Sequence, residues 1–284
     1  MKHACAQRPI HTENAEYQVL CALLANRSKR SQLGEFVLEG VRNINQALAE
    51  GWIFRAVISA QNAALSGWAH EIIESANAPI HYLLAPHLMA KLSGKEQTSE
   101  LMAVVAMRRD DAPSLALGGN PLIALFDRPS NKGNLGTLIR SCDALSVDAL
   151  LVMGHAVDLY DPETIAATMG SFFKLPTACV ASMEALTAWL TAMRQRYPGF
   201  AVVGTSAHAE RAIDEIDLSG PVLLVLGNET DGLSRRLSEA CDALASLPMN
   251  PDGCASSLNI ACAATALFYE AGRQRRRAGQ SSVI

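Results

Sequence analysis

Residues 122–153 read LIALFDRPSNKGNLGTLIRSCDALSVDALLVM, and their pattern of apolar residues indicates the fold class. Its two ends, 122–126 and 149–153, are short apolar runs, and 135–145 between them carries apolar residues at helical spacing. Alternation of this kind predicts an α/β fold in which helices cover the faces of a parallel sheet. Further apolar runs lie at 201–204, 222–226 and 245–247, with helical patterns at 182–195 and 234–241. Ligands of such a sheet bind beyond the carboxyl ends of its strands, so the loops that follow the strands are the candidate sites.

A second domain is expected on the N-terminal side of this sheet. Residues 110–121, DDAPSLALGGNP, are rich in turn-forming residues and are typical of a linker. We therefore predict a small domain over 1–112, a linker over 113–120 and the larger domain over 121–284. The small domain is expected to be α/β, with helices at 14–26, 41–49 and 63–76 and strands at 36–38, 54–59, 80–83 and 104–106.

Composition excludes several classes of protein. Hydrophobic residues make up 49% of the chain and charged residues 18%, which is typical of a globular protein and not of a disordered one. No apolar run is long enough to span a bilayer, and residues 1–18 lack the apolar core of a signal peptide, so neither a membrane nor export is expected. The seven cysteines form no CxxC pair, which argues against disulfides or a metal site and favours a reducing cytoplasm.

The charge of the chain bears on nucleic acid as a partner. A net charge of −4 argues against a protein that coats nucleic acid by bulk charge, although a local patch is enough to bind RNA. Two basic clusters, at 27–30 and 273–277, are expected to be solvated surface.

The first candidate loop follows the strand expected at 122–126 and opens a helix. Gly133 and Gly136 permit tight turning and close approach of the backbone to a ligand. Asn134 can present an amide or cap the helix. Arg140 lies about one turn beyond Gly136, where its planar guanidinium suits a phosphate. Taken alone, the loop is also typical of a glycine-rich turn with a surface arginine.

The second loop, GNETDGLS at 227–234, follows the strand expected at 222–226. Gly227 and Gly232 are spaced like the outer glycines of a P-loop, but Leu233 stands where that motif needs lysine. ATP or GTP binding by this route is therefore disfavoured, and the loop suits backbone contacts with a neutral or cationic ligand. Asn228 offers hydrogen bonds and Glu229 a carboxylate. The alternative is a plain turn followed by a helix cap.

The third loop opens the stretch PMNPDGCASSLNIACAATALFYEAG at 248–272. An apolar helix is expected to begin near Ser256. Ser257 and Asn259 would then lie at its N-terminus, where free N–H groups and the helix dipole favour anions. Simple N-capping is the alternative. The small residues at 260–267 permit close packing, either in a core or against a partner subunit.

Taken together, the three loops resemble the ordered motifs of the SpoU/TrmH family of RNA 2′-O-methyltransferases, in the SPOUT superfamily. The first motif, N-x-G-x-x-x-R, is matched by Asn134, Gly136 and Arg140. The second, N-E-x-x-G after an apolar strand and a glycine, is matched at 227–232. The third is P-M, a glycine and then S-L-N, matched by Pro248, Met249, Gly253, Ser257, Leu258 and Asn259. Residues 169–176, MGSFFKLP, are also typical of the family, and the ordered set covers roughly 121–272.

The resemblance implies a fold, a cofactor and a set of site residues. It implies a C-terminal trefoil knot, a homodimer, no metal, S-adenosylmethionine as cofactor, and RNA as substrate, with ribosomal RNA favoured over transfer RNA. The residues 34–42, GEFVLEGVR, resemble the RNA substrate-binding domain of this family, which is related to a ribosomal-protein fold. The residues implied in cofactor binding are Thr205, Leu226, Gly227, Asn228, Glu229, Gly232, Leu247, Met249, Ser257 and Leu258. The residues implied in catalysis are Arg140, Asn134, Glu229, Ser257 and Asn259.

The family arginine is often described as the base that removes the hydroxyl proton. A guanidinium is an implausible base because it holds its proton tightly. Arg140 is therefore either strongly perturbed by its site or a clamp for an RNA phosphate. Asn134 would orient Arg140 or the ribose, and Glu229 would shape the cofactor and substrate site. Ser257 and Asn259 would fix the phosphate and the arginine.

Two departures from the family pattern lie in loops, and they bear on RNA specificity more than on catalysis. Family members often have D-P directly before the motif asparagine, whereas Asp127 lies seven residues ahead of Asn134, and the third motif is longer between Met249 and Ser257. One rival function is a non-catalytic RNA-binding protein on the same fold, which the retained polar motif residues disfavour. The others are a nucleotide-dependent α/β enzyme and a Rossmann-type methyltransferase, which the missing glycine-rich motifs disfavour.

Overall fold

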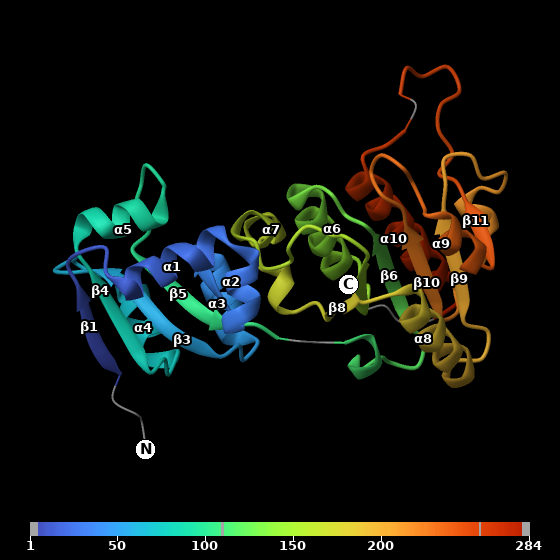
Figure 1. Ribbon diagram of the computed structural model, residues 1–284. Helices are drawn as coiled ribbons and strands as arrows, with labels where there is room; N and C mark the ends of the chain where they lie inside the picture. The colour runs from blue at the N-terminus through green and yellow to red at the C-terminus, as the bar shows by residue number, and fades with distance from the viewer. Residues whose placement is uncertain (1–4, 109–110, 256, 280–284) are drawn as a thin grey trace. The chain divides into compact units, whose positions relative to one another are not determined.

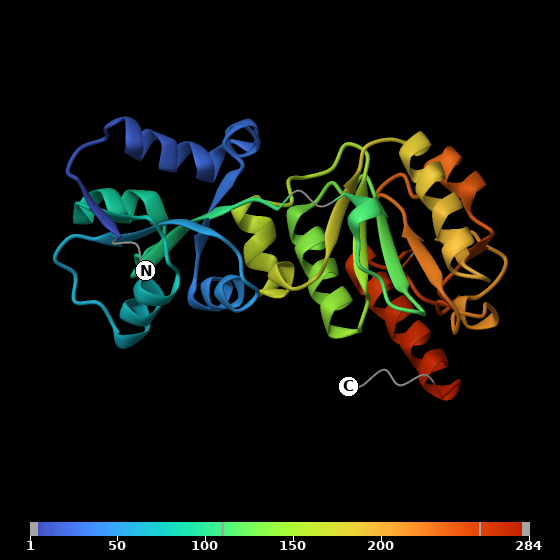
Figure 2. The same cartoon turned by 90° about the horizontal axis from the view of Figure 1, so that it is seen from below.

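The computed structural model describes residues 5–108, 111–255 and 257–279. Those residues form two compact units (Figures 1 and 2). The first unit comprises 1–108 with 158–174, and the second comprises 109–157 with 175–284, each within the described residues. The domain limits expected on either side of the linker at 113–120 stay a prediction. The first unit also contains a segment from the middle of the chain, 158–174, which was not expected.

The described part of the second unit holds a six-stranded sheet of order β11-β9-β10-β6-β7-β8, in which every pairing is parallel. The parallel α/β domain that the sequence predicts is therefore confirmed. The strands are β6 (Leu122–Asp127), β7 (Ala149–Met153), β8 (Thr177–Val180), β9 (Ala201–Thr205), β10 (Val222–Leu226) and β11 (Ala243–Ala245). The helices are α6 (Lys132–Ala144), α8 (Met183–Arg196), α9 (Arg235–Ala240) and α10 (Ile260–Arg277), with short 3-10 turns η1 (Ala112–Ser114) and η3 (Ile213–Glu215).

The central strands of this sheet are buried on both faces because helices cover each side. Ile123 and Leu125 of β6 pack in one core with Trp189 of α8 and Leu237 of α9. Since side chains alternate along a strand, the intervening residues of β6 point to the opposite face. There α6 and α10 pack against each other, as Figure 2 shows for the green and red helices.

Register brings the ends of two central strands together. β6 and β10 pair from Leu122 with Val222 to Phe126 with Leu226. Asp127 and Gly227, the next residues along each strand, therefore lie side by side at the carboxyl edge of the sheet. This edge is where the sequence places the candidate loops.

Two elements of the second unit differ from expectation. β11 lies two residues earlier than the strand expected at 245–247, and β8 was not expected, because its four residues carry too short an apolar pattern. α10 begins at Ile260, after the start expected near Ser256, which lies outside the described residues. The delay follows from Asn259, whose side-chain oxygen accepts from the backbone N–H of Ala261 at 2.9 Å and so caps the helix there.

The sequence predicts that the basic cluster at 273–277 is solvated surface, and this prediction is wrong for Arg275. Arg275 is only 7% exposed. Its guanidinium donates to four backbone carbonyls, those of Asn120, Pro121, Leu218 and Gly220, at 2.6–3.2 Å. Burial lowers the pKa of this guanidinium from its ordinary value. Arg275 therefore anchors α10 to the chain at the amino ends of β6 and β10.

The first unit contains a five-stranded mixed sheet of order β1-β4-β3-β5-β2 within the described residues. β1, β4 and β3 run parallel, and β5 is antiparallel to both β3 and β2. Its strands are β1 (Ala6–Ile10), β2 (Glu35–Glu39), β3 (Phe54–Ala60), β4 (Ile80–Leu84) and β5 (Leu101–Ala106). Its helices are α1 (Ala15–Ala25), α2 (Arg27–Leu33), α3 (Val41–Ala49), α4 (Gly67–Ser75), α5 (Pro86–Ser93) and α7 (Pro162–Thr168), with the 3-10 turn η2 (Ser171–Phe173). The small α/β module is confirmed, whereas β1, α2 and α5 were not expected.

The segment 158–174 is held within the first unit by a buried ion pair and aromatic packing. Arg30 is 2% exposed, and its Nη2 lies 2.7 Å from an oxygen of Asp158. The indole of Trp52 donates to the carbonyl of Phe173 at 2.9 Å and packs edge-on against its ring. The cluster at 27–30 is therefore not simply solvated surface, because Arg30 is a buried structural residue. Among the described residues, no helix is long and apolar enough to cross a membrane.

Candidate functional site

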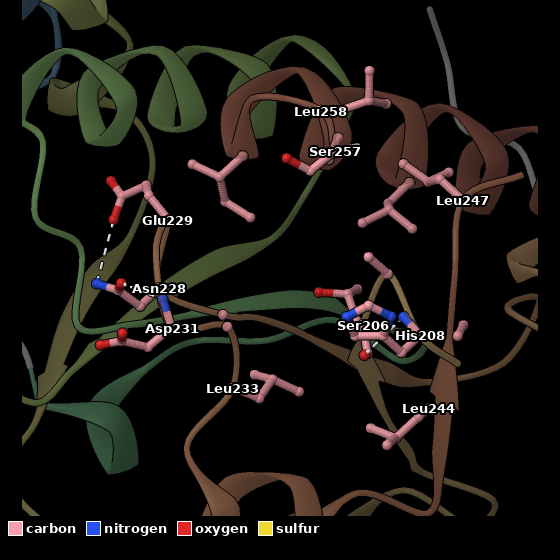
Figure 3. A pocket seen from close by; sticks show the side chains of 18 of the residues that line it. Ser206, His208, Asn228, Glu229, Asp231, Leu233, Leu244, Leu247, Ser257 and Leu258 are labelled. Atoms are coloured by element: carbon pink, nitrogen blue, oxygen red, sulfur yellow. Dashed lines mark hydrogen bonds between the residues drawn. The ribbon is translucent and has the colours of Figure 1, made fainter. Parts of the chain in front are cut away.

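A cavity of about 430 Å³ lies in the second unit, at the carboxyl edge of the sheet. Five segments line it: the end of β9 and the loop after it, the loop after β10, α9 through Ser238, β11 with the loop after it, and the first turns of α10. Figure 3 shows their side chains around one space. Nine of the residues implied in cofactor binding line it: Thr205, Gly227, Asn228, Glu229, Gly232, Leu247, Met249, Ser257 and Leu258. Leu226 is fully buried at the end of β10 and does not line the cavity.

The walls of the cavity combine apolar and acidic surface. Leu233, Leu244 and Leu247 supply apolar side chains. Glu229 and Asp231 supply carboxylates on the side away from Leu247 (Figure 3). Such a lining suits a ligand that has a flat apolar part and a positively charged part.

The loop after β10 is closed on itself. The backbone groups of Asn228 and Gly232 bond to each other in both directions, at 2.9 and 3.1 Å. Gly232 has a left-handed backbone with φ +66°, which favours glycine. A Cβ added to Gly227 would lie 2.4 Å from the carbonyl carbon of Gly232 and 2.5 Å from the nitrogen of Leu233. The glycine spacing that the sequence shows is therefore required by the close approach of the two ends of the loop.

Glu229 ties this loop to the loop that precedes α6. Its carboxylate accepts from the backbone N–H and the hydroxyl of Ser130, at 3.1 and 2.8 Å, and from the backbone N–H of Asn131 at 3.2 Å. Burial of the carboxylate raises its pKa. The hydrogen bonds that it accepts from backbone groups, Ser130 and Asn134 outweigh that effect, so the pKa of Glu229 lies below its ordinary value. The ionised carboxylate is therefore the form that holds the two loops together.

Asn134 connects Glu229 to the third motif. Its side-chain nitrogen lies 3.4 Å from an oxygen of Glu229, and its side-chain oxygen accepts from the amide of Asn259 at 2.9 Å. Asn259 in turn caps α10. One residue from each of the three motifs thus takes part in a continuous series, Glu229–Asn134–Asn259, although the first and last motifs are more than a hundred residues apart.

Arg140 and Ser257 do not take part in the hydrogen-bonded series Glu229–Asn134–Asn259. Arg140 is exposed on α6 and does not line the cavity, and it makes no hydrogen bond or ion pair with the residues that the structure describes. Ser257 is exposed and lines the cavity. The structure therefore does not pair Arg140 with Ser257 or Asn259, and the catalytic roles of all three stay predictions.

Several residues of the site were missed from the sequence. Ser206, His208 and Asp231 line the cavity. Ser130 binds Glu229, and Asn131 caps α6 by accepting from the N–H of Asn134 at 2.9 Å. The S-N pair directly before a helix is a usable capping signal. The loop after β9 carries no comparable pattern, so only the fold could have shown Ser206 and His208.

A metal centre is not evident in the described ranges, since no group of three or more His, Cys, Asp or Glu side chains there is placed to hold a metal ion. The fold and the cavity together define a class of protein. This is an α/β protein that binds a small organic ligand at the carboxyl edge of a parallel sheet, through glycine-rich loops that lack the P-loop lysine.

Comparison with known proteins narrows this class. Residues 121–269 match the SpoU rRNA methylase family, and residues 14–103 match the SpoU L30e-like domain. A 23S rRNA (uridine(2479)-2′-O)-methyltransferase of Streptomyces viridochromogenes is 42% identical over 271 residues, which are 95% of this chain and 93% of that protein.

Solved structures agree with the sequence matches. The SpoU methyltransferase AviRb from Streptomyces viridochromogenes, in complex with the cofactor AdoMet, superposes with a TM-score of 0.86 at 41% identity, over 93% of this chain and 98% of that one. An AdoMet-bound rRNA methyltransferase from Sinorhizobium meliloti gives a TM-score of 0.83 at 26% identity, over 94% of this chain and 98% of that one.

The chain belongs to the SpoU rRNA methylase family. The resemblance seen in the sequence is therefore confirmed, and with it the class of enzyme, an RNA methyltransferase that takes its methyl group from S-adenosylmethionine.

Proposed function

We propose that this protein transfers a methyl group from S-adenosylmethionine to a ribose 2′-hydroxyl of large-subunit ribosomal RNA, with the cavity described above as the cofactor site. The observation that carries the proposal is the meeting of three motifs at one edge of the sheet, joined through Glu229, Asn134 and Asn259. The 23S rRNA specificity of the Streptomyces viridochromogenes relative supports ribosomal RNA over transfer RNA. A ribosomal substrate also fits the cytoplasm that the free cysteines favour.

The residues of the cavity fit the cofactor. Its volume of about 430 Å³ falls in the usual range of small-molecule sites, roughly 300–1,000 Å³. Leu244, Leu247 and Leu258 would hold the adenine between apolar surfaces. Glu229 and Asp231 would attract the positively charged methionine end. When bound, S-adenosylmethionine supplies an electrophilic methyl group on a sulfonium centre.

The residues of the chain would position the RNA hydroxyl for an in-line displacement, for which alignment is a major catalytic contribution. Arg140 is solvent-exposed, and its donors are not used by other described residues, which suits a clamp on an RNA phosphate more than a base. Asn134 and Asn259 would fix the edge of the cavity toward the ribose, and Ser257 would contact the phosphate. Glu229 uses both carboxylate oxygens to hold the loop before α6, so we assign it a shaping role and not proton transfer.

We assign recognition of the RNA to the first unit, which contains the match to the SpoU L30e-like domain. We also propose a homodimer through the outer face of α6 and α10. The α10 part of that face carries the exposed side chains of Cys262 and Tyr269, and Tyr269 is 56% exposed although it is large and aromatic. The trefoil knot implied by the family is part of the same proposal.

The proposal is tested by mapping 2′-O-methyl groups across total RNA from cells with and without the protein. Cells that lack the protein are complemented with the wild type, with Arg140→Ala, or with Arg235→Ala as a control that removes an exposed arginine of α9. We expect a methyl group at a defined ribosomal nucleotide that the wild type and Arg235→Ala restore and Arg140→Ala does not. Purified Arg140→Ala should still bind S-adenosylmethionine within about twofold of the wild-type Kd.

Two results would contradict parts of this proposal. Unchanged ribosomal RNA with a methyl group lost from transfer RNA would overturn the substrate. Restoration of the methyl group by Arg140→Ala would remove Arg140 from the mechanism.

A further inference from the structure

The loop that forms one wall of the cofactor cavity is held from outside by a residue that does not line the cavity. This residue is Arg128, which follows the last residue of β6. Its neighbour Asp127 is 2% exposed and stands beside Gly227 in the register of the sheet. A buried carboxylate needs charged or hydrogen-bonding partners, because burial without them is costly.

The partners of Asp127 are Arg128, the next residue along the chain, and Ser234, which directly follows the cavity loop 227–233. One of its oxygens accepts from Nε and Nη2 of Arg128, both at 3.1 Å. The same oxygen accepts from the backbone N–H of Ser234 at 3.1 Å. Asp127 thus fixes the position of the guanidinium and the end of the loop together.

Arg128 then reaches the loop itself at three points. Its Nη2 donates to the carbonyl of Gly232 at 3.1 Å, and its Nη1 lies 3.6 Å from an oxygen of Asp231. Its own backbone carbonyl accepts from the side-chain amide of Asn228 at 2.7 Å. Asn228, Asp231 and Gly232 all line the cavity, whereas Arg128 does not.

The side chain of Arg128 also requires a glycine beside it, at position 154. A Cβ added to Gly154 would lie 2.6 Å from Cγ of Arg128. Gly154 has φ +78° and accepts no ordinary side chain easily. The arginine therefore lies across the end of β7 in a place that only a glycine leaves open.

We propose that Arg128 is a positioning residue for the cofactor, which holds the loop 227–233 in the conformation that binds S-adenosylmethionine. The assignment rests on the proposed function of the cavity. Because the loop is closed between Asn228 and Gly232, holding these two residues from outside fixes the whole loop. Without the guanidinium, the loop loses its contact at Gly232 and must be ordered by the cofactor itself, which weakens binding without changing the chemistry of the bound complex.

The test compares variants of the full chain by calorimetric titration with S-adenosylmethionine. Arg128→Met keeps the aliphatic stem beside Gly154 and removes the guanidinium. Arg128→Lys keeps the positive charge beside Asp127 but cannot donate in the fork that reaches Gly232 as well. The control is Arg194→Met, which breaks an ion pair with Asp242 elsewhere in the same unit.

We expect the Kd of Arg128→Met to rise about tenfold, that of Arg128→Lys to rise less, and that of Arg194→Met to stay within about twofold of wild type. With ribosomal RNA from cells lacking the protein as substrate, the KM for S-adenosylmethionine should rise with the Kd in Arg128→Met, while kcat at saturating cofactor should stay within about twofold.

A double variant separates positioning from stability. Arg128→Met alone leaves the Asp127 carboxylate buried without its main partner, which destabilises the fold. Combining Asp127→Asn with Arg128→Met removes that charge, so the Tm should recover while the Kd stays weak. Recovery of the wild-type Kd in the double variant, or an unchanged Kd in Arg128→Met, would overturn the assignment. Wild-type protein that binds no S-adenosylmethionine would overturn the proposed function and the assignment together.

Discussion

Replacing Gly227 with alanine tests whether the cavity depends on the close approach of the backbone at Gly227 to the backbone at Gly232. The added methyl group would lie 2.4 Å from the carbonyl carbon of Gly232, 2.5 Å from the nitrogen of Leu233 and 2.8 Å from Cα of Gly232. Unstrained carbon contacts lie at about 3.5–4.0 Å, so the two ends of the loop must separate by about 1 Å. The obstructing atoms belong to the backbone and cannot rotate away as a flexible side chain would.

The magnitude follows from what this separation breaks. The pair of backbone hydrogen bonds between Asn228 and Gly232, at 2.9 and 3.1 Å, closes the loop and would be lost. Each such bond contributes about 0.5–1.5 kcal/mol net, so the loop is destabilised by about 1–3 kcal/mol. Because this loop forms a wall of the cavity, the same free energy should appear as a loss of cofactor affinity of roughly five- to 150-fold.

The assay is calorimetric titration of Gly227→Ala with S-adenosylmethionine, beside urea unfolding of the same protein. Gly220→Ala is the matched control, because it makes the same chemical change in the same unit where a Cβ meets nothing within 4 Å. The control should bind like the wild type. If Gly227→Ala also binds like the wild type, the close approach of Gly227 and Gly232 is not needed for the site, and the reasoning is refuted.

Two further predictions concern stability. Arg275→Met should lower the free energy of unfolding in urea by about 2–4 kcal/mol, because four backbone carbonyls lose their donor. The control is Arg277→Met, which changes an exposed arginine of the same helix and should leave the free energy of unfolding unchanged. Equal unfolding curves for the two variants would contradict the anchoring role of Arg275. The pKa of Glu229 lies below its ordinary value of 4.5, so its contribution to stability is complete above 4.5 and is lost as the pH falls through the lower folded value. Urea unfolding of the wild type and Glu229→Gln should therefore differ by a constant amount above about pH 5 and converge below that, and a difference independent of pH would show that the carboxylate charge does not hold the loops.

The elements that the sequence predicts are those with a strong local pattern. β6 and β10 lie where the apolar runs placed them, because both strands are buried on both faces and form continuous apolar runs. α6 was predicted from its helical spacing, but it begins three residues before the expected 135, because Asn131 caps it. β1 was missed because four of its five residues are exposed and carry no alternation. α2 was missed because its seven residues, RSKRSQL, are mostly polar and its one buried side chain is Arg30.

The site was predictable to the extent that local chemistry marks it. Gly227 and Gly232 stood out because of their spacing, and Asn134 and Asn259 because they stand near helix N-termini. Their direct contacts with Glu229 and with each other depend on tertiary structure, and no local pattern encodes them. The family resemblance linked the segments before the fold did.

Charged side chains in the interior were the least predictable feature. Arg30, Asp127 and Arg275 are each less than 10% exposed, although residues of these types are usually solvated. Each has at least one partner from a distant part of the chain, as Asp158 is for Arg30 and the backbone N–H of Ser234 is for Asp127. Such partners can be found only once the fold is known.

Hydrogen exchange with and without S-adenosylmethionine is the strongest test of whether the three motif segments together form one binding site for the cofactor. Backbone amides at 131–136, 227–234 and 257–263 should all exchange more slowly with the cofactor present, and to a similar extent, while amides of the first unit should be unaffected. Slower exchange in only one of these windows, or at a surface elsewhere in the chain, would contradict the account.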